Sequence, residues 1–438
     1  MEWTQEQREQ EKRKFYNAII LAKPLDYSDE NERSQYIKGL HGENGAVDRL
    51  LVEIDMREAE GVFLFSGQPA SGKSTEMLRL KHRLETEKGV QKVYYLDLAE
   101  YLNPSEPIEF GGFVLAILVA WLELLKKEKV KLGEQNYLQR LQNFLSKTEV
   151  TLDGIEIGSD DFGTLRMSLK TDEGFRTALH QAIQKRKTHF IGEMHTFIGE
   201  IYGEIAKSGE KCVLLVDSIE KIQGTAFNTK DVYESVSQLF SRNAHALKLP
   251  FLHVVYSIPP YVLEQNRNLP ALLGGAASVQ LPSVHVFKKK SCDPDDTILN
   301  LMVELISKRY PQYHEFFNDT QIKTLAEKSG GKLRDFLRAI HLCLLEISTR
   351  KIDRVDEECL KLAQSQIKPT NIIPTDIWQW LKKIDETHQP SIGNEIDALT
   401  LEKYLTTQHV LVYLNGDAWY GVHPLLRDEL NTHVHSVS

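Results

Sequence analysis

The chain has 438 residues, a net charge of -9 and 41% hydrophobic residues. At about 150 residues per domain, this length predicts roughly three domains, and the composition excludes a disordered scaffold. The acidic balance disfavours binding to nucleic acid through an overall positive charge. Four cysteines lie far apart without a CxxC pair, which excludes a zinc ribbon and indicates a reducing compartment.

The N-terminal segment, 1–45, is predicted to be helical, with an amphipathic pattern over 5–22. Its polar start, MEWTQEQREQEKRKF, lacks the apolar core of a secretory signal, so we expect a cytoplasmic protein. A second amphipathic helix is predicted over 46–57, directly before the first strand signal.

Five short apolar or β-branched runs are each predicted to be a strand. They lie at 61–65, 93–98, 213–217, 251–257 and 277–282. Because helical patterns separate the first four, the sequence predicts an α/β fold with a mainly parallel sheet covered on both faces, spanning 46–290. The apolar run at 113–125 is too short for a membrane span and contains Glu123, so it is predicted to be a buried helix and no membrane contact is expected.

The segment 128–207 separates the second and third strands and is interpreted as an insertion into this core. Its alternating stretch VTLDGIEIGSDDFGTLRMSL predicts a β-hairpin that turns between Gly158 and Gly163. A helix of about thirty residues is predicted to follow, because apolar residues recur at helical spacing from Phe175 to Ile205. Ordinary packing and a partner surface are both open roles for this insertion.

The sheet signals stop near residue 290, and two helical modules are predicted beyond it. Residues 291–368 form a helical lid by this interpretation. Residues 369–438 are interpreted as a winged-helix domain, because two helical patterns precede two strands joined at Asn415 and Gly416.

The motif GQPASGKST follows the first strand and precedes a helical pattern, as a P-loop requires. We predict that the following residues bind nucleotide: Gly67, Gln68, Pro69, Ala70, Ser71, Gly72, Lys73, Ser74 and Thr75. Glycines let the loop backbone surround a triphosphate, the lysine reaches the β and γ phosphates, and Ser74 can coordinate Mg²⁺. The predicted cofactors are therefore ATP and Mg²⁺, with Asp217, at the end of VLLVD, as the second metal ligand.

Candidate catalytic residues besides Lys73 follow from their places at strand ends and in the lid. Ser218 rather than a glutamate follows Asp217, so Glu220 is the first candidate to orient water, with a helix-capping charge as its other reading. Glu100 is the weaker alternative. Ser257 ends the fourth strand and is predicted to contact the γ phosphate or water, or to cap a turn.

Arginines offer three further candidates. Arg334 begins a lid helix and is predicted to register the γ phosphate, with an exposed ion pair as the alternative; Arg338 lies one turn further. Arg267 is the one candidate for an arginine finger acting on a neighbouring subunit. Tyr36 and Ile37 are candidates to line an adenine pocket, and the chain has no NKxD motif for guanine.

The P-loop, Asp217, Ser257 and Arg334 occur in an order that resembles AAA+ and STAND-type P-loop ATPases, particularly the origin-recognition-like branch. The stretch FLFSGQPASGKSTEMLRLKHRLETEKGVQKVYYLDLAEYLN also resembles ATPases of bacterial anti-phage defence operons. The resemblance implies an ATP-driven switch that forms a homo-oligomer and acts on an effector protein. The displaced glutamate favours slow hydrolysis.

Two alternatives remain open at this point. One is an origin-recognition-like ATPase that binds or loads onto DNA; the other is a scaffold locked by nucleotide without turnover. Residues 351–438 contain eight Lys and Arg against thirteen Asp and Glu, a balance of 8 - 13 = -5, which disfavours DNA. The basic stretches at 185–189 and 288–290 are the better candidates for nucleic acid or for a neighbour's nucleotide.

Overall fold

A computed structural model describes most of the chain, and these residues divide into two compact units. The described ranges are 3–19, 23–42, 45–132, 137–147, 162–225, 227–275, 277–369, 373–390 and 398–435. One unit comprises Ala46–Ser66 and Glu76–Gln280 and is called here the sheet unit. The other comprises Met1–Gly45, Gly67–Thr75 and Leu281–Ser438 and is called the loop-and-lid unit, because it contains the P-loop.

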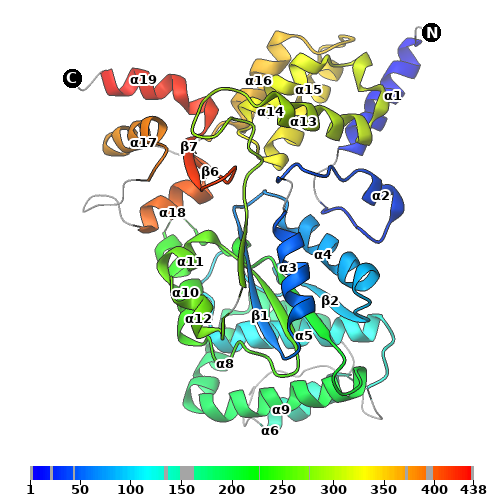
Figure 1. Cartoon of the computed structure of the whole chain (residues 1–438), viewed down its shortest axis with the longest axis vertical. Helices are drawn as coiled ribbons and strands as arrows, with labels where there is room; N and C mark the ends of the chain where they lie inside the picture. Colours follow the sequence, from blue (N-terminus) through cyan, green and yellow to red (C-terminus); the bar gives the residue numbers. More distant parts are fainter. Residues whose placement is uncertain are drawn as a thin grey trace. The chain divides into compact units, whose positions relative to one another are not determined.

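A five-stranded sheet forms the centre of the sheet unit (Figure 1). Its strands are β1 (Gly61–Gly67), β2 (Lys92–Asp97), β3 (Cys212–Asp217), β4 (His253–Ile258) and β5 (Ala277–Leu281), in the order β2-β3-β4-β1-β5. The pairs β1 with β4, β3 with β4 and β2 with β3 are parallel. Strands β1, β3 and β4 are buried along their whole length, as expected for a parallel sheet covered on both faces. The five predicted strands are thus confirmed.

Helices accompany the sheet in the chain order expected for an α/β fold. They are α3 (Ala46–Met56), α4 (Lys73–Glu87), η1 (Leu98–Glu100), α5 (Phe110–Lys127), η2 (Ile219–Lys221), α10 (Thr229–Arg242), α11 (Pro260–Gln265) and α12 (Leu269–Leu272). Helix α5 contains the apolar run, and its Trp121 is fully buried, which confirms the predicted core helix. Among the described residues, no helix has the length and apolar character needed to cross a membrane.

In the segment between β2 and β3, the regular elements among the described residues are all helices, which corrects two predictions. It contains α6 (Tyr137–Lys147), α7 (Phe162–Thr171), α8 (Glu173–Lys185) and α9 (Lys187–Ile205). The second arm of the predicted hairpin is α7, while the first arm lies outside the described residues. The single long helix was also wrong, because Arg186 leaves the helical region at φ -136° and ψ 32° and separates α8 from α9.

The loop-and-lid unit is built on a bundle of helices. They are α1 (Gln5–Ala18), α2 (Glu30–Ser34), α13 (Asp296–Arg309), η3 (Pro311–Glu315), α14 (Asp319–Lys328), α15 (Leu333–Thr349) and α16 (Glu357–Ile367). One apolar core joins Phe15 of α1 to Phe336 and Ile340 of α15, and it also includes Trp419 of strand β7 (Trp419–Val422). Full burial of one such apolar side chain stabilises the folded state by about 1.5–3 kcal/mol.

The C-terminal part of this unit ends in a small antiparallel sheet. Its elements are α17 (Thr375–Thr387), α18 (Ala398–Thr406), β6 (Val410–Tyr413), β7 (Trp419–Val422), η4 (Pro424–Leu426) and α19 (Arg427–His435). The turn between the strands contains Gly416 at φ 106°, a left-handed conformation suited to glycine. Trp378, Trp380 and Trp419 are buried, so these aromatic residues belong to the core and are not an exposed contact surface.

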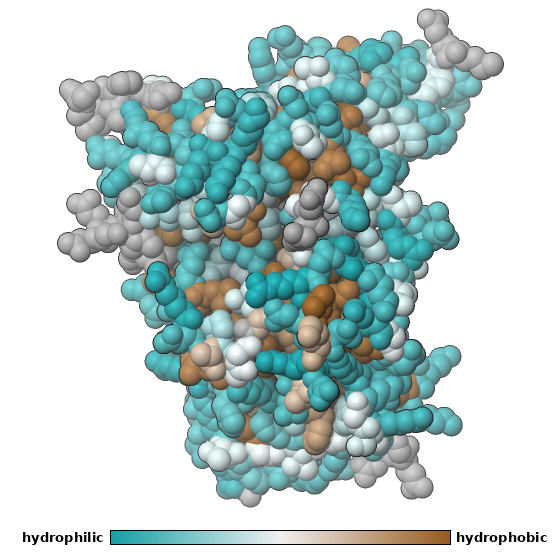
Figure 2. Space-filling view, in the orientation of Figure 1, coloured by the Kyte–Doolittle hydropathy of each residue, from teal (hydrophilic) through white to brown (hydrophobic). Residues whose placement is uncertain are grey.

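Hydrophilic side chains predominate on the face shown in Figure 2, and apolar residues appear there in scattered patches. This distribution agrees with the high share of charged residues, 26% of the sequence.

Candidate functional site

The P-loop, Gly67–Thr75, leaves β1 and leads into α4, as the motif predicts. Gly72 lies at φ 97°, and a Cβ on Gly67 would come within 2.8 Å of the Leu281 carbonyl oxygen, so both positions require glycine. Lys73 is the first residue of α4, and its Nζ donates to the carbonyl oxygens of Gly67 at 2.7 Å and Gln68 at 2.9 Å. The loop therefore bends around its own lysine.

The Gln68 side chain connects this loop to three other segments of the same unit. Its Oε1 accepts hydrogen bonds from Lys332 Nζ at 2.8 Å, Ser283 Oγ at 3.1 Å and the Val412 backbone N–H at 3.5 Å. Its Nε2, like Ser71 Oγ, is buried without a hydrogen-bond partner among the described residues. Because a buried donor without a partner is costly, these two groups fit a ligand that brings acceptor oxygens to the loop.

Lys332, immediately before α15, is a site residue that no motif in the sequence indicated. Its side chain is fully buried, and its Nζ also lies 3.4 Å from the Pro69 carbonyl oxygen. Burial lowers the pKa of Lys332 to about 7, because desolvation disfavours the charged ammonium. Arg334 was predicted to contact the γ phosphate, with Arg338 one turn further along the helix. Both arginine side chains are exposed.

Asp217 ends β3 in the sheet unit and is fully buried. Its Oδ2 accepts from the Tyr95 hydroxyl at 2.7 Å, and its Oδ1 accepts from the Ser218 backbone N–H at 2.7 Å. Ser218 has φ 74°, which is uncommon for a residue with a side chain and directs the chain sharply away from the strand. The carboxylate is therefore held in one orientation at the carboxyl end of the sheet.

Glu220 and Ser257 were predicted separately, and the structure brings them together. Glu220 lies in η2, is 7% exposed, and its Oε2 accepts from Ser257 Oγ at 2.9 Å. Ser257 is fully buried in β4, in register with Phe65 of β1. A carboxylate and a hydroxyl thus meet at the carboxyl edge of the sheet, the edge from which β1 continues into the P-loop.

The remaining candidates have less support from their surroundings. Glu100 and Arg267 are exposed. Ile37 is 3% exposed and belongs to the apolar core that contains Phe15. The ring of Tyr36 packs against that of Tyr27, with 5.4 Å between the ring centroids. The basic stretch 288–290 is exposed, as are Lys185, Arg186 and His189 of the other basic stretch.

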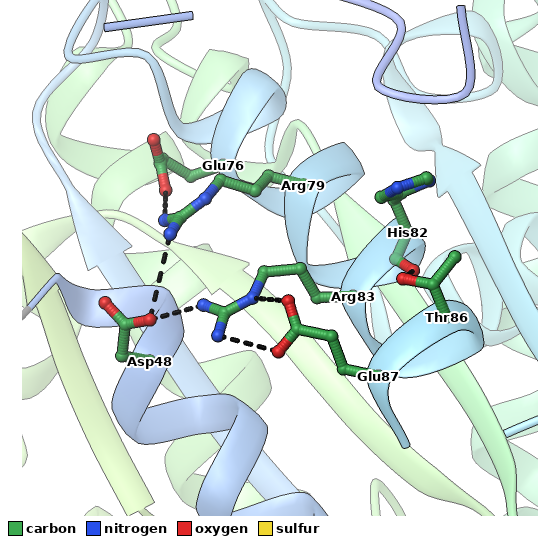
Figure 3. A network of polar contacts seen from close by, with 7 residues as sticks. All are labelled: Asp48, Glu76, Arg79, His82, Arg83, Thr86 and Glu87. Carbon is green, nitrogen blue, oxygen red and sulfur yellow. Dashed lines mark hydrogen bonds and ion pairs between the residues drawn. The ribbon is translucent and has the colours of Figure 1, made fainter. Parts of the chain in front are cut away.

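The helix that follows the P-loop is attached to α3 by charged side chains (Figure 3). Arg79 lies 3.0 Å from Glu76 and 3.7 Å from Asp48, while Arg83 pairs with Asp48 and with Glu87. The hydrogen bond from Arg83 lowers the pKa of Glu87. These contacts hold α4 against α3. They therefore help to position the beginning of α4, where the P-loop ends.

The described residues contain no cluster of three or more His, Cys, Asp or Glu side chains suited to a metal ion. The hydroxyl of Ser74 and the carboxylate of Asp217 each offer oxygen, the ligand type that Mg²⁺ prefers. Ser74 belongs to the loop-and-lid unit and Asp217 to the sheet unit.

No model of a known protein family matches the chain, and no curated protein matches it. The alignment with the ORC2 protein of Aeropyrum pernix, in ADPNP and ADP complexes, covers 91% of this chain and 97% of that protein, at 10% identity and a TM-score of 0.40. The alignment with the ORC1 protein of Aeropyrum pernix in complex with DNA covers 97% of this chain and 98% of that protein, at 11% identity and a TM-score of 0.39. The alignment with a Walker-type ATPase of Pyrococcus abyssi covers 94% of this chain and 99% of that protein, at 13% identity and a TM-score of 0.42. At such identities and TM-scores, these similarities do not identify a family.

Proposed function

We propose that this protein is a regulatory switch that binds and hydrolyses ATP. The observation that carries the proposal is the P-loop, which bends around Lys73 at the end of a buried parallel strand. Asp217 and the pair formed by Glu220 and Ser257 support it, because they supply a metal-side carboxylate and a second acid at the carboxyl edge of the same sheet.

Each residue has a distinct task in this proposal. Lys73 and the loop amides bind the β and γ phosphates, and Ser74 and Asp217 hold the magnesium, which supplies charge neutralisation when bound. Glu220 orients the attacking water, and Ser257 fixes the direction of the Glu220 carboxylate. Because this glutamate stands three residues after Asp217 and is itself held by a hydroxyl, we propose slow turnover.

Replacing Glu220 with glutamine is expected to lower the hydrolysis rate on the order of 10²-fold while leaving ATP affinity unchanged. Glutamine keeps an oxygen that can accept from Ser257, so the change removes the base and not the packing. Phosphate release in a single turnover measures the rate, and calorimetry measures affinity. Glu100→Gln is the matched control; if it slows hydrolysis and Glu220→Gln does not, the assignment of the catalytic glutamate is wrong.

We further propose that the switch acts through assembly with copies of itself and with an effector protein in the cytoplasm. The bacterial antiviral role rests on the sequence resemblance alone, and α17 and α18 with β6 and β7 are proposed to be a winged-helix domain. Native mass measurement with and without ATP tests the assembly. If the protein hydrolyses ATP but its measured mass is the same with and without nucleotide, the proposed switch is contradicted. If it binds ATP tightly without hydrolysing it, the nucleotide-locked scaffold is the remaining alternative.

A DNA-binding ATPase is the second candidate, favoured by one observation. The lysines at 288–290 are consecutive and exposed. Lys289 pairs with Asp417 in the β6–β7 turn at 3.2 Å, which offsets part of this positive charge. Because the C-terminal region is acidic, we expect no duplex DNA binding at physiological salt. Titration of labelled duplex at about 50 and 200 mM salt decides this, since a phosphate-binding surface loses affinity steeply over that range. Affinity lost on changing all three lysines to alanine would promote the DNA-binding alternative.

A further inference from the structure

Lys332 reaches the P-loop because of the two residues before it. Gly330 and Gly331 adopt φ 63° and 78°, and this left-handed turn directs the chain between α14 and α15. Lys332 then extends from the beginning of α15 so that its Nζ donates to Gln68 Oε1, at 2.8 Å, and faces the Pro69 carbonyl oxygen. Lys73 Nζ donates to the carbonyl oxygen of the same Gln68. Two lysine ammonium groups thus meet at one residue of the loop.

The charge on Lys332 has only neutral acceptors. Among the residues that the structure describes, its two hydrogen-bond acceptors are amide oxygens, while Asp335 and Glu402 act on it through their charge. The cost of burying the ammonium outweighs the attraction of these carboxylates, since the pKa of Lys332 is lowered. A bound anion would compensate such a charge. The place where Lys332 ends is the loop predicted to receive a phosphate.

We propose that Lys332 is a second cation of the phosphate site, presented by the lid, and that its protonation sets how tightly the P-loop holds a nucleotide. This inference rests on the proposed nucleotide binding. It replaces Arg334, whose side chain is exposed, as the lid residue that acts on the loop. In the structure, the neutral Gln68 side chain accepts from Lys332 and holds it at the loop. By this proposal, the anion binds to a lysine that is already in place.

The charged groups around Lys332 set the direction of its pH response. Burial has the largest effect and lowers its pKa, Asp335 and Glu402 raise it, and Lys73 and Arg334 lower it; together they bring the pKa of Lys332 to about 7. The pKa of His423, which is fully buried, is lowered first by burial and next by the charge on Lys332, so the two groups act on one another. A bound phosphate favours the charged ammonium and must raise the pKa of Lys332. Binding therefore takes up a proton, and affinity is highest below pH 7 and falls as the pH rises from 7 through the raised pKa of the complex.

Calorimetric titration of the full chain with ADP, without magnesium, tests this proposal. We expect the affinity to fall about sixfold from pH 6.5 to 8.5, which is most of the tenfold limit set by a pKa raised by about one unit. Titrations in buffers of different ionisation enthalpy should show part of a proton taken up per ADP near pH 7.5. Lys332→Met is expected to bind about tenfold more weakly at pH 6.5, to match the unchanged protein at pH 8.5, and to take up no proton through this residue.

Arginine stays charged from pH 6.5 to 8.5, so Lys332→Arg gives the pH dependence of ADP affinity with a fixed positive charge at this position. Any pH dependence that remains in this variant comes from other groups, such as the nucleotide phosphate. Lys328→Met, in α14, is the matched control for a lysine outside the loop and should keep the full pH response. Equal pH profiles and proton uptake in Lys332→Met, Lys332→Arg and the unchanged protein would overturn the inference. If the unchanged protein binds no ADP or ATP at all, the proposed function fails with it.

Discussion

Replacing Lys73 with alanine is expected to reduce ATP hydrolysis on the order of 10³-fold and to weaken nucleotide binding as well. The substitution removes the cation expected to reach the β and γ phosphates. It also removes the donor that holds the carbonyl oxygens of Gly67 and Gln68 at 2.7 and 2.9 Å, so the loop loses its own internal support. The variant is therefore expected to lose both binding and turnover, whereas Glu220→Gln is expected to lose turnover alone. Steady-state phosphate release and calorimetric binding of ATP measure the two effects.

Lys81→Ala is the matched control for this variant, because Lys81 lies two turns further along α4 and pairs with Glu85 at the surface. A surface pair of this kind contributes at most about 1 kcal/mol, so activity should hardly change. ATP binding that survives Lys73→Ala at full strength would show that the loop does not hold phosphate in the proposed way.

Replacing Gly331 with alanine is expected to destabilise the loop-and-lid unit by more than about 4 kcal/mol. Gly331 has φ 78°, and a Cβ at this position would lie 1.8 Å from the Val284 carbonyl oxygen. The Gly331 carbonyl also accepts from the Val284 N–H at 3.2 Å, so neither backbone segment can move away without losing that bond. Chemical denaturation followed by far-UV circular dichroism measures the change.

Gly39→Ala separates the two causes of this loss. Gly39 belongs to the same unit and has φ 86°, but the nearest atom that a Cβ would meet there, Leu301 Cδ1, lies 4.0 Å away. Alanine at this position meets only the conformational strain, about 1–3 kcal/mol. Similar losses for the two variants would show that the contact with Val284 is not tight.

The sheet and the P-loop could be predicted because their signals are local. Each strand is a short apolar run, and the motif stands directly between β1 and α4. The hairpin prediction failed at α7 because alternation there was mistaken for strand spacing. Phe162, Leu165 and Leu169 are buried and lie three and four residues apart, as on one helix face, whereas Met167 is 54% exposed.

The role of Lys332 depends on contacts between distant residues, so no local motif reveals it. A helical signal was nevertheless present. Lys332 precedes Phe336 by four residues and Ile340 by eight, so it continues the buried face of α15. Arg334 and Arg338 lie on another face, which is exposed. Likewise, the pairing of Glu220 with Ser257 required the sheet order, since no spacing within one segment predicts it.

The hydrogen bonds of Gln68 also bear on the order in which the protein is completed during synthesis. Ser283, Lys332 and Val412, the three donors to its side chain, leave the ribosome long after the P-loop itself. Contacts across such sequence separations form late in folding. The P-loop therefore emerges early from the ribosome but gains its full set of hydrogen bonds only after β6 has been translated.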